Sequence, residues 1–213
     1  MEPWSAVLGA GGFALGLAAD RLATRWPEHD EEHPPGRAVD WRTATTALVG
    51  AVAFGLLPLR FGPDPIAFLV FGAWFGTLVV GLATDLDQRL LPDLLTLPVI
   101  PVAFAYALSG ADPLVGSEVI LAVAAALIIP AILFLPSIPF GAGAFGIGDV
   151  KLLIGVGLLA GWSRALGSVV FALVVAGIVL IVLLAARRIG RRTYVPFGPF
   201  FILGALWAVL LRG

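Results

Sequence analysis

Two short acidic segments carry the residues that could do chemistry in this chain. The first is TDLDQRLLPD at residues 84–93, and the second is GIGDVKL at residues 146–152. Asp85 directly follows a long apolar run, and Asp149 directly precedes one. Two carboxyl groups that approach closely in a partly dry site hold one proton between them. The ionised carboxylate can then activate a water molecule as general base, while the protonated one donates to a carbonyl oxygen.

The composition leaves little material for other catalytic groups. The chain has no cysteine, and its only histidines, His29 and His33, lie in one polar segment. Thiol nucleophiles, disulfides and thiolate metal sites are therefore excluded, and histidine-dependent triads are disfavoured. We expect neither a metal nor a cofactor. The net charge of −1 gives no overall basic field, so we expect no nucleic-acid partner either.

The residues around Asp149 suit a close approach between chain segments. Gly146 and Gly148 permit a positive φ, and they let another helix or a peptide come near the backbone. Lys151 follows at once and is the only lysine of the chain. A Gly-x-Gly pair alone is a weak signal in a chain with 26 glycines, but it is far more specific when joined to Asp-x-Lys-Leu at the edge of an apolar run.

A plainer interpretation of both segments stays open from composition alone. Asp85, Asp87 and Asp93 could belong to a hydrated loop that helps to fix the membrane topology. Asp149 could be the N-cap of a helix, which is a favoured use of aspartate. Neither alternative requires the two segments to meet.

The elements that must position these residues are apolar helices. Apolar residues make up 60% of the chain and charged residues 13%, whereas soluble domains have about 45–50% and about 25%. The mean hydropathy is +1.02. A helix of about 20 apolar residues spans a bilayer. The sequence therefore predicts an all-α polytopic membrane protein with about eight transmembrane helices, over residues 4–19, 43–59, 65–84, 94–108, 115–135, 150–161, 165–186 and 199–211.

The distribution of positive charge predicts the orientation of these helices. Most of the 13 lysine and arginine residues fall in loops that share one side of the membrane, and only Arg60, Arg164 and Arg212 fall on the other. The positive-inside rule then puts both termini on the outer side and both aspartate segments at the cytoplasmic face. We expect one membrane-embedded domain over residues 1–213, with no soluble domain. Residues 25–42 should form a short, solvated, proline-stiffened cytoplasmic loop.

At these positions the chain resembles the type IV prepilin leader peptidases, a family of bacterial aspartyl peptidases with a Gly-x-Gly-Asp motif. Residues 85–93 look like the family's Asp-x-Asp-x-x-x-Leu-Pro-Asp, and residues 146–152 match its Gly-x-Gly-Asp-x-Lys-Leu. Residues 196–199 resemble its Pro-Phe-Gly-Pro before the last helix. The resemblance implies that Asp85 and Asp149 are the catalytic pair. It implies supporting or substrate-binding roles for Asp87, Asp93, Gly146, Gly148 and Lys151.

The resemblance also implies an activity and a location. Members of this family are endopeptidases of the bacterial cytoplasmic membrane. At its cytoplasmic face they remove a short basic leader, after a glycine, from prepilins of type IV pili or pseudopilins of type II secretion. The implied partners are this substrate and the lipid bilayer. Acidic residues near the site, including Asp87 and Asp93, are expected to attract the basic leader.

One departure from the family pattern concerns a second activity. Many family members also methylate the new N-terminus, and they carry a longer first cytoplasmic loop with Cys-x-x-Cys motifs that bind zinc. Here the loop is short and cysteine is absent. The zinc module is therefore missing, and we assign neither an N-methyltransferase activity nor S-adenosylmethionine.

Two other classes of membrane protein are alternatives. A transporter or channel could use the acidic residues to bind cations or relay protons, but it would place them near the bilayer midplane. A presenilin-like or signal-peptide-peptidase-like enzyme shares the Gly-x-Gly-Asp element and the chemistry. Those enzymes typically place the first aspartate after a tyrosine, whereas Thr84 precedes Asp85 here.

Overall fold

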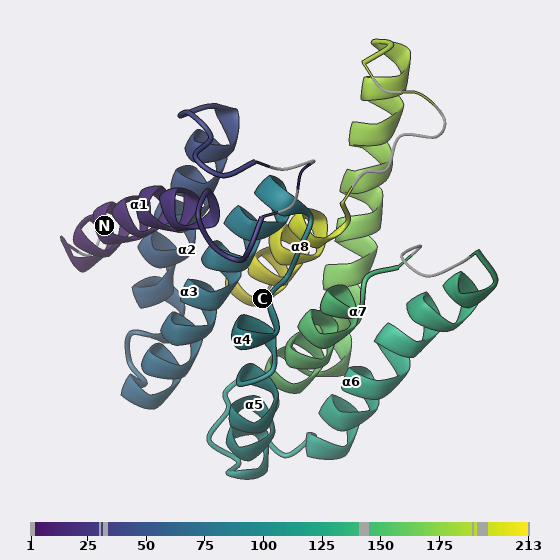
Figure 1. Cartoon of the computed structure of the whole chain (residues 1–213). Coiled ribbons are helices and arrows are strands. Elements are labelled where there is room, and N and C mark those ends of the chain that lie inside the picture. The colour runs from purple at the N-terminus through teal and green to yellow at the C-terminus, as the bar shows by residue number, and fades with distance from the viewer. Residues whose placement is uncertain are drawn as a thin grey trace.

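The computed structural model describes residues 3–29, 31, 34–140, 145–188, 190 and 196–212. These residues form helices and contain no strand (Figure 1). The helices are α1 (Pro3–Ala23), α2 (Trp41–Phe61), α3 (Pro65–Gln88), α4 (Asp93–Thr96), α5 (Val99–Leu108), α6 (Val119–Phe134), the 3₁₀ helix η1 (Leu135–Phe140), α7 (Ile147–Ala185) and α8 (Gly198–Leu210).

The prediction of an all-helical membrane protein is confirmed. In the described part of the chain, 5 helical segments are long and apolar enough to cross a bilayer. They are α1, α2, α3, the segment from α6 into η1, and α7. The segments Asp93–Leu108 and Gly198–Leu210 are apolar but shorter.

A glycine divides the longest helix. The predicted runs 150–161 and 165–186 both lie in α7, and Gly161 interrupts this helix with a φ of 70° and a ψ of 175°. A residue without a Cβ adopts this conformation at little cost. The second part of α7, light green in Figure 1, rises past the other helices at the top of the view. The predicted boundary at Gly161 thus coincides with a real break in the helix.

The predicted helical run over residues 94–108 is interrupted rather than absent: it is divided into α4 and α5, although the two residues between them keep helical dihedral angles. The break lies at Leu97 and Pro98, and Pro98 is the N-cap of α5. Proline has no N–H, so it cannot donate the hydrogen bond that would continue the preceding helix. Pro101 falls in the first turn of α5, where its missing N–H has no helical partner in any case.

Helix α8 lies in the middle of the bundle and organises the candidate site. It packs against α2, α3 and α7 (Figure 1). Phe201 and Ile202 are fully buried, and Phe201 makes an edge-to-face contact with Phe145, which lies just before α7. Within a bilayer, close van der Waals packing of this kind holds helices together, because lipid tails are as apolar as the side chains. The packing brings the N-terminus of α8 next to the end of α3 and the start of α7.

Candidate active site

The two predicted catalytic aspartates line one cavity. Asp85 lies in the last turn of α3 and Asp149 in the first turn of α7. The cavity has a volume of about 420 Å³. Asp85 is 5% exposed and Asp149 is 9% exposed, and the charge of Asp149 acts on Asp85. The fold therefore brings the two acidic segments together as a pair of buried carboxyl groups.

Gly148 allows the two segments to meet. A Cβ at this position would lie 2.8 Å from the Cβ of Leu91 and 3.3 Å from its carbonyl oxygen. Any side chain would therefore push residues 84–93 away from the start of α7. The close approach predicted for this glycine is confirmed. The positive φ that glycine permits is not used at Gly146 or Gly148.

Gly146 holds the carboxyl group of Asp149 at the start of α7. It is the N-cap residue, with a φ of −69° and a ψ of 136°. Asp149 lies three residues later, and its carboxyl group lies against Gly146, since a Cβ at Gly146 would be 3.0 Å from Oδ2 of Asp149. The side chain at the third helical position thus turns back toward the N-cap residue, as it does in a capping box. The interpretation of Asp149 as the N-cap itself is therefore wrong, although it does help the helix to start.

Gly198, the first residue of α8, lies directly against Asp85. A Cβ at Gly198 would be 2.5 Å from Oδ2 of Asp85 and 2.8 Å from its Cγ. That Oδ2 atom is buried and has no hydrogen-bond partner among the described residues. Pro196 and Phe197 line the same cavity. Gly198 was not predicted to be a site residue. The Pro-Phe-Gly-Pro motif at residues 196–199 was the available signal, but it was taken only as part of the family resemblance.

An ion pair joins the two acidic segments at the edge of the cavity. Nζ of Lys151 lies 2.5 Å from Oδ1 of Asp93, and both residues line the cavity. Lys151 comes from the first turns of α7 and Asp93 begins α4. Of the predicted supporting residues, Asp93, Gly146, Gly148 and Lys151 thus lie around the two aspartates.

Asp87, the remaining supporting residue, does not line the cavity. It lies two positions after Asp85 on α3, and residues at this spacing lie on different faces of a helix. Its Oδ1 atom accepts a hydrogen bond of 2.7 Å from Nε of Arg37, and Nε2 of His29 lies 3.4 Å from its Oδ2. Asp87 therefore anchors residues 25–42 to the end of α3.

Arg37 ties three helices together at this end of the bundle. Besides Asp87 on α3, it donates to Asp20 on α1 at 2.5 Å and to Asp40, the N-cap of α2, at 2.6 Å. Burial alone lowers the pKa of Arg37, but the hydrogen bonds that it donates to Asp87 and Asp20 raise this pKa above its usual value, so the guanidinium stays charged. The expectation of a loop that is merely solvated is wrong at Arg37. Nothing in the sequence distinguishes it from the other arginines.

Comparison with known proteins identifies the family. The model of the type IV leader peptidase family matches residues 72–182, a range that contains both acidic segments. The chain belongs to this family. The match favours a leader peptidase over the transporter and presenilin-like alternatives.

Relatives of known name carry the same description. The chain is 38% identical over 158 residues to the prepilin leader peptidase/N-methyltransferase of Burkholderia pseudomallei (strain 1026b), covering 73% of this chain and 50% of the relative. It is 31% identical over 180 residues to that of Dickeya chrysanthemi, covering 84% and 63%. It is 32% identical over 174 residues to that of Aeromonas hydrophila, covering 79% and 56%. The chain thus spans half to under two thirds of the length of these relatives. No solved structure matches it.

The residues of this chain do not fit the zinc-binding loop that many members of the leader peptidase family carry. The chain has no cysteine to supply thiolate ligands. His29 is paired with Asp87, and His33 lies outside the described residues. In the described part of the chain, His, Asp and Glu form no group of three that could hold a metal ion.

The attraction of a basic leader by Asp87 and Asp93 receives no support from the structure. Asp87 is paired with Arg37 and Asp93 with Lys151, so neither carboxylate offers an uncompensated charge. Three further acidic residues of the first cytoplasmic loop were also expected to attract the leader. Of these, Glu31 is exposed, and Asp30 and Glu32 lie outside the described residues.

Replacing Arg37 with glutamine is expected to destabilise the protein by about 2 kcal/mol, because Asp20 and Asp87 would lose the guanidinium that they share and keep only Arg21 and Arg42 as cationic neighbours. Leader cleavage should fall as well, since Asp87 lies only two residues after Asp85 in the last turn of α3. Thermal unfolding of the purified protein in detergent measures the first effect. Arg25→Gln is the control, because Arg25 is exposed in the same loop. Equal unfolding temperatures for the two variants would show that the Arg37 network carries no stability.

Proposed function

We propose that this protein is a membrane aspartyl endopeptidase that removes the leader of type IV prepilins or type II secretion pseudopilins. Asp85 and Asp149 carry the reaction. One observation supports this most: two buried carboxyl groups from distant parts of the sequence share a single cavity. Both residues lie at the ends of candidate membrane spans, where an aqueous leader and an apolar helix can both reach them.

The chemistry needs only these two groups and one water molecule. The ionised aspartate takes a proton from the water, whose oxygen attacks the carbonyl carbon of the scissile bond. The protonated aspartate donates its proton to the carbonyl oxygen, which gives a tetrahedral gem-diol. On its collapse the C–N bond breaks, the leaving nitrogen takes up a proton, and the leader departs with a new carboxyl group. A shared proton is the natural state of two carboxyl groups held close together.

The proposed setting is the bacterial cytoplasmic membrane, with the aspartate cavity at its cytoplasmic face. In this proposal α7 crosses twice, turning at Gly161, and the chain has eight spans with both termini outside. Ten of the 13 lysine and arginine residues then lie inside, as the positive-inside rule requires. The basic leader of the substrate stays in the cytoplasm while its apolar helix lies in the bilayer.

The proposal covers peptide-bond cleavage only. The relatives' names also include N-methyltransferase, an activity that is left out of this proposal. The cavity residues account for hydrolysis without a metal or a cofactor.

Co-expression with a candidate prepilin, in a host that lacks its own leader peptidase, tests the proposal. Wild-type protein is expected to convert the prepilin to a shorter form with a single new N-terminus, seen by gel shift and by intact mass. An empty vector and the same prepilin with its glycine before the cut replaced are the controls. If several prepilins and pseudopilins all stay uncut although the protein is inserted in the membrane, the proposal fails.

A further inference from the structure

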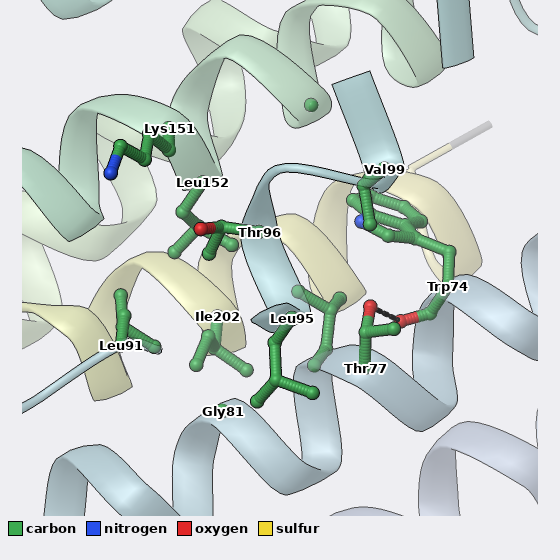
Figure 2. Close-up of a pocket in the computed structure, with 12 residues that line it drawn as sticks. Trp74, Thr77, Gly81, Leu91, Leu95, Thr96, Val99, Lys151, Leu152 and Ile202 are labelled. Carbon is green, nitrogen blue, oxygen red and sulfur yellow. Dashed lines mark hydrogen bonds between the residues drawn. The ribbon is translucent and has the colours of Figure 1, made fainter. Parts of the chain in front are cut away.

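A small hollow between α3 and α7 lies beside the cavity of the two aspartates. Leu91 and Lys151 line both the cavity and this hollow, whose volume of about 20 Å³ has room for about one water molecule. In Figure 2 these two residues lie at the left of the hollow, and Trp74 and Val99 lie at its right. The hollow therefore lies between the candidate active site and α5.

At its far side the hollow opens into an apolar groove of about 370 Å³ between α3 and the α4–α5 segment. Trp74, Thr77, Leu95 and Val99 line both the hollow and the groove. No residue that lines the groove carries a charge. We name this groove the α3–α5 groove, and it lies along α3 beyond the hollow as seen from the aspartates.

The groove exists because the α4–α5 segment covers α3 incompletely. The chain breaks at Pro98, and α5 has only 10 residues. Leu69, on the α3 side of the groove, is 70% exposed, and Val102, on the α5 side, is 57% exposed. Large apolar side chains that line a concave surface mark a place where another apolar group binds.

We propose that the α3–α5 groove holds the apolar helix of the substrate, the segment that directly follows the cleaved bond. This inference rests on the proposed function. A substrate whose scissile bond lies between Asp85 and Asp149 must have its apolar helix leave the cavity at once, and this groove runs along α3, the helix that carries Asp85 in its last turn. From Thr77 to Leu69 the groove follows α3 for about 12 Å at 1.5 Å per residue, enough for about 8 residues of a helix.

A second apolar groove gives an internal comparison. It lies between α2, the second part of α7 and α8, and has a volume of about 350 Å³. It shares no lining residue with the aspartate cavity or with the hollow of Figure 2. Val52 in this second groove is 57% exposed, the same as Val102. A lipid chain should occupy both grooves equally, whereas the substrate helix should occupy only the α3–α5 groove.

Single-cysteine crosslinking distinguishes these occupants, because the native chain has no cysteine. Val102→Cys and Val52→Cys are each reconstituted in vesicles with prepilins that carry one cysteine in the apolar helix. Val102→Cys is expected to give a disulfide-linked adduct with the prepilin, and Val52→Cys is expected to give none. Equal adducts at both positions, or none at Val102, would overturn the proposal and leave lipid as the occupant of the groove.

A kinetic comparison separates this inference from the proposed function. Val102→Trp, which fills the α3–α5 groove, should raise the KM for a full prepilin about tenfold, or about 1.4 kcal/mol of lost binding. Val52→Trp should leave it unchanged. If the wild type cleaves and Val102→Trp cleaves equally well, the groove is not the docking site although the peptidase assignment stands. If the wild type cleaves no prepilin, the proposed function fails, and crosslinking at Val102 still reports whether the helix docks there.

Discussion

Replacing either Asp85 or Asp149 with asparagine is expected to reduce leader cleavage by about 10²–10⁴-fold, the usual contribution of a positioned general acid or base. Asparagine keeps the size of the side chain and a hydrogen-bonding oxygen, but it cannot take or release the proton. Because the two carboxyl groups act as one unit, the double variant should be no less active than either single variant. Cleavage rates of a purified prepilin in lipid vesicles measure the effect.

The matched control is Asp112→Asn. Asp112 is also a buried aspartate, and its Oδ1 accepts backbone hydrogen bonds from Leu114 and Val115, far along the chain from either acidic segment. An asparagine oxygen can accept the same bonds, so cleavage should stay at the wild-type rate. A loss of cleavage in all three variants would indicate misfolding. Wild-type cleavage by Asp85→Asn or Asp149→Asn would remove that residue from the mechanism.

Replacing Gly198 with alanine is expected to lower the rate of cleavage by about 10²-fold while changing stability little, since a displacement of about 1 Å at a catalytic group has an effect of this size. The nearest atoms to the added Cβ all belong to the carboxyl group of Asp85, the closest at 2.5 Å. A carboxyl group at the end of a side chain can rotate away, so the helices need not move. The change therefore displaces the reacting group and leaves the packing of α8 intact.

Gly76→Ala is the control for this variant. Gly76 also lies on α3, and a Cβ there would meet nothing within 4 Å. Alanine favours a helix over glycine by about 1 kcal/mol, so this variant should be at least as stable as the wild type and fully active. If Gly198→Ala unfolds at a markedly lower temperature, or cleaves as fast as Gly76→Ala, then the contact with Asp85 does not position its carboxyl group.

The sequence was sufficient to predict the helices and the pairing of the two acidic segments. Long apolar runs predict membrane helices. One predicted run ended at Gly161, which is where helix α7 is interrupted. The run over residues 94–108 was less informative, because it contains two prolines, Pro98 and Pro101. A proline interrupts a helix only when it lies beyond the first turn, and hydrophobicity does not show where α5 begins.

Other parts of the site depend on contacts that no sequence pattern displays. Helix α3 ends at Gln88, one turn beyond the predicted Thr84, so Asp85 and Asp87 are both helical and face different neighbours. Arg37 looked like any arginine of a polar loop, yet it pairs with three carboxylates from three helices. Gly198 matters only because the fold places it beside Asp85. Each of these features follows from tertiary packing rather than from local sequence.

The most direct test of the central claim is the mass of the products that purified protein makes from a purified prepilin in lipid vesicles. No other protein is present, so a host peptidase cannot be responsible. The wild type is expected to release the leader by a single cut on the N-terminal side of the apolar helix, and Asp85→Asn and Asp149→Asn are expected to leave the prepilin intact. The same cut made by either asparagine variant, or an uncut prepilin with a folded wild type, would contradict it.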